Sequence, residues 1–229
     1  MKKLFILVNK LSEFSSFKYF DEYLSGVLVS IGESLPQDTD DYDLILLWNY
    51  RKIIPGLGNK RNVVVFHSSD LPRGKGWAPI YYTITNGEEY YTVTGMLPNE
   101  QVDAGDILVK ARFKMKDNYT ANQLRDWDNR IMLMLTGELL HKYSTSILCG
   151  IPQEGTESFY KRRRPEDSEV NLNETLGSIV NHLRACESSY PAFFWFNNTK
   201  YYIYVRPELN AEFPADLEIK FYGVTQEKK

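Results

Sequence analysis

His67 and Asp103 are the two residues of this sequence whose type and position best suit proton transfer. His67 follows the apolar run Val63–Phe66 and precedes a stretch rich in glycine and proline. Histidine changes its protonation near neutral pH, so it can act as a general acid or base. Asp103 lies in a turn that contains Gly105, and a carboxylate beside a histidine stabilises the imidazolium. Each residue alone also suits a structural role, but the pair predicts a site of acid–base chemistry.

The strands that must position this pair are predicted in the first half of the chain. Leu4–Val8 is an apolar run without alternation, as expected for a strand covered on both faces. Residues 68–77 are expected to form a loop, and Pro79 to begin a short helix. Ligands bind at the carboxyl ends of strands in an open α/β sheet, which is where His67 falls. Further strands are predicted over residues 27–31, 44–48, 63–66, 91–97 and 107–113.

Apolar residues at helical spacing predict two helices beside these strands. The first helix is expected soon after the opening strand, with Ser12 or Ser15 as its N-cap. The second is long and amphipathic. Its apolar face is formed by Leu124, Trp127, Ile131, Leu135 and Leu139.

The last third of the chain changes character. Leu176–Leu183 suits a helix, and Phe193–Phe196 with Tyr201–Val205 reads as a β-hairpin. The sequence therefore predicts an α/β fold with a Rossmann-like, mostly parallel sheet and flanking helices in residues 1–150. Residues 151–229 are expected to add a small helix and a β-hairpin. An unpaired strand edge invites pairing, so the hairpin is also the expected contact of a homodimer.

Composition excludes several kinds of protein. Of the 229 residues, 43% are hydrophobic, which excludes a disordered chain. No apolar run reaches the roughly 18 residues that span a bilayer, so no membrane association is expected. The net charge of −3 argues against nucleic acid as a partner, although residues 161–164 form one dense basic run that suits a solvated loop or an anionic ligand. Two cysteines, Cys149 and Cys186, form neither a disulfide framework nor a metal site, which favours a cytoplasmic protein without a metal.

Two ordered blocks surround His67 and Asp103. Residues 66–80 contain a His-x-Ser-x-Leu-Pro segment, followed by glycine, proline and a short helix. Residues 94–107 place Thr-Gly on a strand before Val-Asp-Ala-Gly-Asp-Ile. This order and spacing resemble the 10-formyltetrahydrofolate-dependent formyltransferases, over residues 43–113 well and over the remainder more loosely.

The resemblance implies a reaction and the residues that carry it. A substrate amine would attack the formyl carbon of 10-formyltetrahydrofolate, without a covalent enzyme intermediate and without a metal. His67 would take the amine proton or hydrogen-bond the oxyanion, and Asp103 would orient His67 and help the leaving nitrogen accept a proton. The run 47–55 resembles the family segment whose backbone holds the pterin ring. The residues so implied in cofactor binding are Trp48, Tyr50, Ile53, Leu71 and Val102.

Val65 departs from the family pattern, which usually has an asparagine two residues before the histidine. The amide of that asparagine helps to polarise the formyl oxygen, and losing an oxyanion donor typically costs about a hundred- to a thousandfold in rate. We hypothesise that Asn49, at the end of the strand expected beside that of His67, supplies the donor instead. A backbone N–H is the alternative, and a third interpretation is a poor catalyst.

The last third suggests the amine substrate. Residues 159–167 resemble the Tyr-x-Arg-Arg-x-Pro-Glu-Asp segment of the sugar N-formyltransferases, and residues 182–194 resemble their Ile-Arg-Ala…Pro-x-Ala-Phe-Phe stretch. That branch acts on nucleotide-linked amino sugars. Arginine can bind pyrophosphate bidentately, and aromatic rings stack on bases. The substrate-binding residues so implied are Lys75, Trp77, Tyr160, Arg163, Arg184 and Phe194.

Other functions stay open. Methionyl-tRNA formyltransferases carry a further C-terminal domain and a basic surface, whereas this chain has a net negative charge and a short segment after Gly150. Glycinamide-ribonucleotide formyltransferases have a Gly/Ser-rich phosphate loop after the first strand, where residues 9–14 here contain no glycine. A folate-binding module without turnover and a hydrolase that releases formate are alternatives from other classes.

Overall fold

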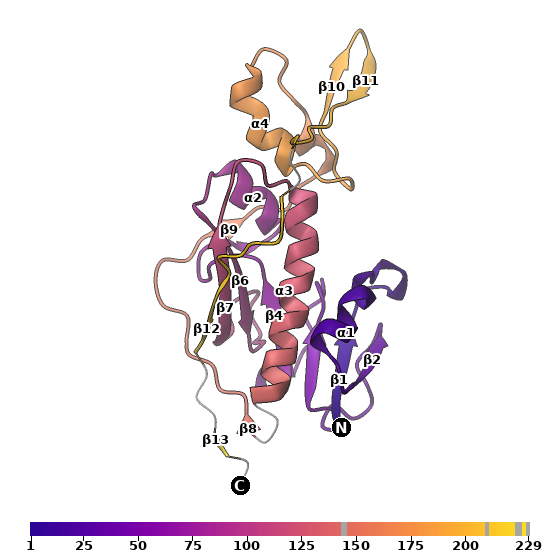
Figure 1. The fold of residues 1–229 in the computed structure, drawn as a ribbon, viewed down its shortest axis with the longest axis vertical. Coiled ribbons are helices and arrows are strands. Elements are labelled where there is room, and N and C mark those ends of the chain that lie inside the picture. Colours follow the sequence, from indigo (N-terminus) through magenta and orange to yellow (C-terminus); the bar gives the residue numbers. More distant parts are fainter. Residues whose placement is uncertain (143–145, 209–210, 223–225, 228–229) are drawn as a thin grey trace.

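The computed structural model describes the chain except residues 143–145, 209–210, 223–225 and 228–229, and a seven-stranded sheet forms its centre (Figure 1). The strand order is β12-β7-β6-β4-β3-β1-β2. The strands β2, β1, β3 and β4 are parallel to one another. The remaining pairs, β4 with β6, β6 with β7 and β7 with β12, are antiparallel. Five of the seven strands therefore point one way, which confirms the Rossmann-like, mostly parallel α/β sheet. The strands are β1 (Lys2–Leu7), β2 (Val27–Gly32), β3 (Leu44–Leu47), β4 (Val63–His67), β6 (Tyr90–Met96), β7 (Ile107–Lys114) and β12 (Glu218–Phe221).

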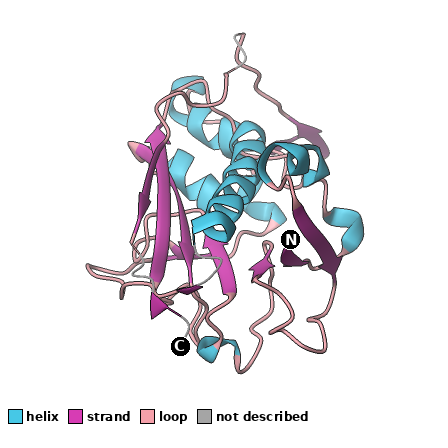
Figure 2. Cartoon of the chain, turned by 60° about the horizontal axis from the view of Figure 1, so that its bottom comes forward, coloured by secondary structure: helices cyan, strands magenta, loops and turns pink. Residues whose placement is uncertain are grey.

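The two faces of the sheet are covered differently. One face packs on α2 (Pro79–Thr85) and the long predicted helix α3 (Ala121–Lys142), which share one apolar core with it (Figure 2). The other face of β1, β3 and β4 is covered by loops and by the 3-10 helix η3 (Leu57–Asn59). None of the helices in the described ranges is long and apolar enough to cross a membrane.

The first predicted helix is wrong as a single element. The chain instead forms two 3-10 segments, η1 (Leu11–Glu13) and η2 (Ser16–Tyr19), before the four-residue α1 (Phe20–Tyr23), and neither 3-10 segment has a side-chain N-cap. The rings of Phe14, Phe17 and Phe20 pack on one another at 4.9–5.8 Å, and Phe14 also packs on Trp48. This aromatic cluster determines the path of the segment more strongly than helical propensity does.

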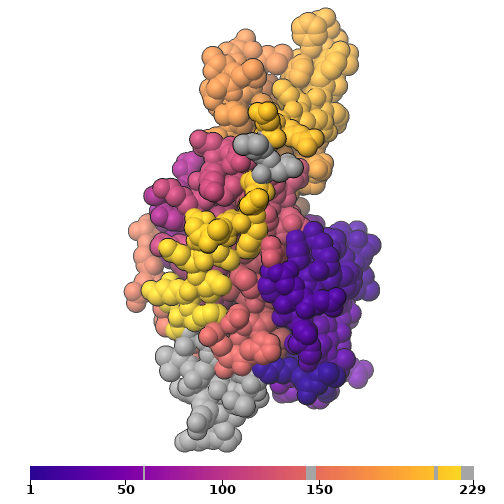
Figure 3. Space-filling view, in the orientation of Figure 1, coloured from indigo at the N-terminus to yellow at the C-terminus, as the bar shows by residue number. Residues whose placement is uncertain are grey.

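The chain after residue 150 leaves the sheet and later returns to it. The helix α4 (Leu176–Ala185) and the hairpin of β10 (Phe193–Phe196) and β11 (Thr199–Tyr202) project above the sheet, as predicted (Figure 1). We call residues 165–205 the upper lobe. The chain then runs back over the surface, in yellow in Figure 3, and β12 pairs with β7. The division at residue 150 stays a prediction, since the sheet takes strands from both sides of it.

Short elements complete the described chain. The turn of the hairpin consists of Asn197 and Asn198, both with positive φ. The second strand, β11, therefore begins at Thr199, two residues before the predicted start at Tyr201. The strands β5 (Lys75–Gly76) and β9 (Phe159–Tyr160) pair with each other, as do β8 (Ser146–Ile147) and β13 (Gln226–Glu227). The 3-10 helix η4 spans Pro165–Ser168.

Gly137, in the interior of α3, allows the closest approach between this helix and α1. A Cβ at this position would fall well inside contact distance of the Tyr23 carbonyl oxygen. Glycine costs about 1 kcal/mol relative to alanine in a helix interior, so packing explains the residue here.

Gly137→Ala should therefore destabilise the protein even though alanine favours helix. We expect the free energy of unfolding to fall by about 2 kcal/mol, as in other overpacked cores, measured by urea denaturation. Gly177→Ala in the exposed first turn of α4 is the matched control and should leave stability unchanged or slightly higher. Equal stability of Gly137→Ala and wild type would contradict the close approach.

Candidate active site

His67 and Asp103 lie together at the end of β4. The Nδ1 atom of His67 is 3.5 Å from Oδ2 of Asp103, and only 9% and 16% of the two side chains are exposed. Along β4, Val64 and Phe66 face the core shared with α3, whereas Val63 and Val65 face the loop-covered side. His67, two residues after Val65, continues on that side. The pair expected from the sequence is therefore assembled beneath the loops.

Backbone groups hold both members of the pair. The Nε2 atom of His67 is 2.7 Å from the carbonyl oxygen of Gly74, and the Gly76 N–H donates to Oδ2 of Asp103 at 2.8 Å. Both neighbours of the imidazole are oxygen acceptors, to which a ring nitrogen that carries a hydrogen can donate. The ring is thus held between a main-chain carbonyl and a carboxylate.

The loop that carries these backbone groups requires glycine. Gly74 and Gly76 have φ of +72° and +97°, and a Cβ on either would lie within 2.7 Å of Tyr160. Tyr160 stacks on Tyr82 with ring centroids 4.6 Å apart, and burial raises the pKa of its phenol. Tyr160, expected to bind substrate, therefore packs on the loop beside His67.

Gln153 fixes the turn of Asp103 and was not found by sequence reasoning. Asp103 has φ of +52°, and the Nε2 atom of Gln153 donates to the carbonyl oxygens of Asp103 and Gly105, both at 2.9 Å. Gln153 and the Asp103 turn are about fifty residues apart in the sequence and meet only in the folded chain. A single glutamine after Pro152 carries no sequence pattern that could have revealed the contact.

Asn49 follows β3, the strand that neighbours β4. Leu47, the last residue of β3, pairs with Val65 of β4. The carbonyl oxygen of Asn49 accepts a hydrogen bond from Asn9 at 2.8 Å, and Asn49 is exposed. The expected adjacency of the two strands is correct, and the role of Asn49 as oxyanion donor stays a prediction.

The residues expected to bind the cofactor separate into two groups. Ile53 and Val102 are 64% and 52% exposed, and their loops adjoin where Gly58 lies against Asn99. Tyr50 is half-buried.

Two side chains of that set belong to the core. Trp48 is buried against Phe14 at 5.1 Å, and Leu71 is also buried. The burial of both side chains makes them part of the packing beneath the site, and their role in cofactor binding stays a prediction.

The side chains expected to bind the substrate differ in their exposure to solvent. Trp77 is 42% exposed, with the Arg162 guanidinium 4.7 Å from its ring centroid. Lys75 is almost fully buried and forms an ion pair with Glu157 at 2.7 Å. Phe194 is half-buried and stacks on Tyr201 with ring centroids 5.5 Å apart.

Arg163 and Arg184 are structural, so the expectation that they bind substrate is wrong. The guanidinium of Arg163 is buried 3.7 Å from the Tyr81 ring centroid and donates to Oγ of Ser168 at 2.6 Å. Arg184 is buried and donates to the carbonyl oxygen of Tyr119 at 2.7 Å. Both cations are used to hold the upper lobe to the core.

Residues 37–131 match the model of the family described as formyl transferase. Residues 37–131, which include both His67 and Asp103, therefore form a formyl transferase domain. A curated relative, the methionyl-tRNA formyltransferase of Acetivibrio thermocellus, is 28% identical over 187 residues, covering 81% of this chain and 55% of the relative. The chain spans about half the length of the curated relatives it matches.

Several solved structures share the fold of this chain. The match to a methionyl-tRNA formyltransferase from Clostridium thermocellum covers 100% of this chain and 100% of that chain, with a TM-score of 0.72 at 22% identity. A sugar N-formyltransferase from a Shewanella species has a TM-score of 0.66 at 17% identity and covers 92% of this chain and 100% of its own. HypX from Aquifex aeolicus, in complex with tetrahydrofolic acid, has a TM-score of 0.65 at 18% identity, covering 93% of this chain and 39% of its own.

Among the described residues, no three His, Cys, Asp or Glu side chains lie together as a metal ion would require.

Removing the Gln153 amide should loosen the Asp103 turn. Gln153→Ala leaves two part-buried carbonyl oxygens without this donor, so we expect the free energy of unfolding to fall by about 2 kcal/mol. Chemical denaturation measures the change. Gln101→Ala, at an exposed position of the same loop, should change nothing. If both variants behave alike, Gln153 does not fix the turn.

Proposed function

We propose that the protein transfers the formyl group of 10-formyltetrahydrofolate to the amino group of a nucleotide-linked amino sugar. The observation that carries this proposal is the contact of His67 with Asp103 at the end of β4, held by the backbone of Gly74 and Gly76. A mostly buried imidazole between a carbonyl and a carboxylate suits a group that takes and returns a proton.

The reaction forms a bond from the substrate nitrogen to the formyl carbon and breaks the bond from that carbon to the folate nitrogen. His67 takes the proton that the attacking amine loses, and Asp103 stabilises the resulting imidazolium. The proton then passes to the departing folate nitrogen, so the overall reaction neither takes up nor releases one.

The folate is proposed to lie between the loops of Ile53 and Val102. Two exposed apolar side chains on adjoining loops, near His67, suit a flat ring system with a few polar edges. The likeness of the fold to HypX, solved with tetrahydrofolic acid, supports a folate as the ligand.

The sugar nucleotide is proposed to bind beside Trp77 and Arg162. An exposed indole with a guanidinium over its ring offers a stacking surface and a cation for a pyrophosphate. The fold likeness to sugar N-formyltransferases supports this substrate, whereas the curated sequence relatives favour methionyl-tRNA as the alternative. A net charge of −3 favours the smaller substrate.

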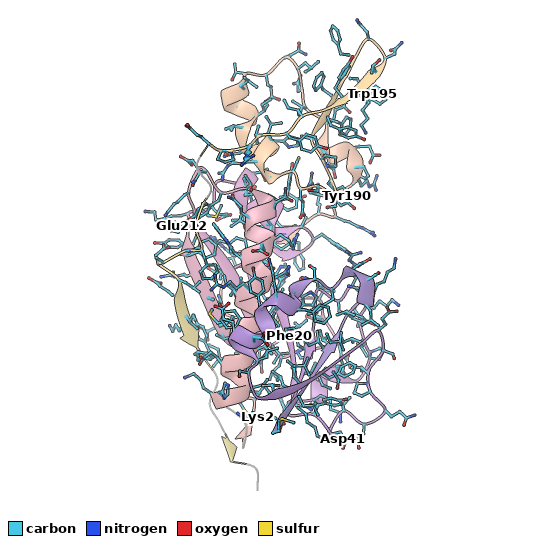
Figure 4. All side chains as sticks on the ribbon, turned by 45° about the vertical axis from the view of Figure 1, so that its right-hand side comes forward. Lys2, Phe20, Asp41, Tyr190, Trp195 and Glu212 are labelled. Carbon is cyan, nitrogen blue, oxygen red and sulfur yellow. The ribbon has the colours of Figure 1, made fainter. Side chains whose placement is uncertain are left out.

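The same proposal includes a homodimer and a cytoplasmic location. The projecting hairpin exposes Trp195 (Figure 4), Phe196 and Tyr202, and we keep it as the contact of a homodimer. Both cysteines are free, which suits the cytoplasm.

A folate-release assay tests the reaction. With 10-formyltetrahydrofolate and UDP-, dTDP- or GDP-linked 4-amino sugars, we expect turnover with one sugar. His67→Asn and Asp103→Asn should each lower it by about a hundred- to ten-thousandfold. His141→Asn, at an exposed position of α3, is the matched control.

The remaining arms separate the alternatives. Turnover with methionyl-tRNA alone would overturn the sugar assignment, and release without any amine would indicate a hydrolase. Folate binding with no turnover at all would indicate a module that only binds.

The Asn49 amide is tested by two substitutions, because its backbone has φ of +46°. Asn49→Ala and Asn49→Gly should both lower turnover by about a hundred- to a thousandfold if the amide holds the oxyanion. Adding Val65→Asn, on the side that His67 faces, should restore part of the rate. Asn197→Ala, with φ of +47° in the hairpin turn, controls for backbone strain. Unchanged turnover of both Asn49 variants would assign the donor to a backbone N–H.

A further inference from the structure

Asp128 is a completely buried carboxyl group on the opposite side of β4 from the pair. It lies on α3 and is fully enclosed by the core. Burying an ionised group costs several kcal/mol unless its surroundings compensate. We therefore expect the carboxyl group to have a role that an apolar side chain at this position could not fulfil.

Two hydroxyl groups donate to the same oxygen of Asp128. Oγ of Ser68 and the phenol of Tyr91 each lie 2.8 Å from Oδ1. Donors aimed at one carboxylate oxygen stabilise the anion. Oδ2 is buried and has no hydrogen-bond partner among the described residues. Only one of the two carboxyl oxygens, Oδ1, is thus held by hydrogen bonds from the described residues.

The charges around Asp128 connect it to the catalytic pair. The pKa of Asp128 lies above its usual value because burial outweighs the opposite effects of Arg125, Ser68 and Tyr91, and His67 also acts to lower it. Arg125 also forms an ion pair with Glu187 at 3.1 Å, so its charge is shared.

Ser68 makes the connection to His67 direct. It follows His67 in the chain and turns toward α3, while His67 turns toward the loops and Asp103. The next carbonyl, of Ser69, accepts from Oγ1 of Thr94 at 2.7 Å. The end of β4 is therefore fastened from α3 and from β6 at the residues that present the imidazole.

We propose that Asp128 is a positioning residue for formyl transfer, which fixes the end of β4 through Ser68 and places a second negative charge behind the His67 imidazolium. The inference rests on the proposed function for its kinetic consequence. Its structural part concerns His67 alone and can be measured without turnover.

The structural part is tested by following the His67 ring signals by NMR across pH, with His67→Asn to assign them. Asp128→Asn keeps the shape of the side chain and an acceptor for Ser68 and Tyr91 but removes the charge. The His67 titration midpoint should move to lower pH, by about tenfold in proton affinity, because the imidazolium loses a neighbouring anion. Asp126→Asn, which removes a carboxylate of α3 that faces Lys18, is the matched control and should not move it. An unmoved midpoint in Asp128→Asn overturns the proposal.

The kinetic part separates positioning from general stability. In Asp128→Asn, kcat should fall about ten- to a hundredfold, with KM for both substrates within about twofold and the acid limb of the pH profile moved to lower pH. A merely structural residue would lower the melting temperature and leave the pH profile in place, which would contradict the proposal.

Further results distinguish a failure of the positioning role from a failure of the proposed function. Should Asp128→Asn fail to fold, Ser68→Ala removes one donor and should shift the His67 midpoint in the same direction by a smaller amount; no shift there would also overturn the proposal. A shifted midpoint without turnover of the wild type on any amine would end the proposed function and support the positioning role. Normal turnover with an unmoved midpoint would end the positioning role and leave the proposed function intact.

Discussion

The pleat of β4 is the constraint on which the site depends. Successive side chains of a strand point to opposite faces, so Val64 and Phe66 pack into the core of α3 while Val65 and His67 face the loops. The apolar residues fix the register, since a slip of one residue would exchange the two faces. The imidazole is therefore oriented by the burial of its neighbours, before any of its own hydrogen bonds form.

Main-chain groups then do much of the positioning. The carbonyl of Gly74 and the N–H of Gly76 contact the pair directly, and Gln153 holds the backbone around Asp103. Backbone groups have fewer degrees of freedom than long side chains, so such a site loses little conformational entropy when substrate arrives. The loop can have this form because glycine adopts the left-handed conformations that it requires.

The elements that could be predicted are those with a regular apolar pattern. Six of the seven strands of the sheet and α3 follow from buried runs and helical spacing, whereas β12, which is mostly exposed, was not predicted. The contact of His67 with Asp103 was expected from two ordered blocks. The first helix failed because contacts among Phe14, Phe17 and Phe20 outweigh propensity. Arg163 and Arg184 were misread because a sequence does not tell whether a guanidinium meets a ligand or the protein's own rings and carbonyls. Contacts such as that of Gln153 with the Asp103 turn join distant segments and leave no local pattern.

The return of the chain to the sheet makes the upper lobe an insertion rather than a tail. Its entry is tied to the loop of Gly74 and Gly76 where β9 pairs with β5, and its exit is tied to the far edge of the sheet where β12 pairs with β7. A segment anchored at both ends can change its outer residues while its two attachment points stay in register with the core. In this architecture, surfaces that recognise partners can diverge in evolution independently of the residues that perform the chemistry.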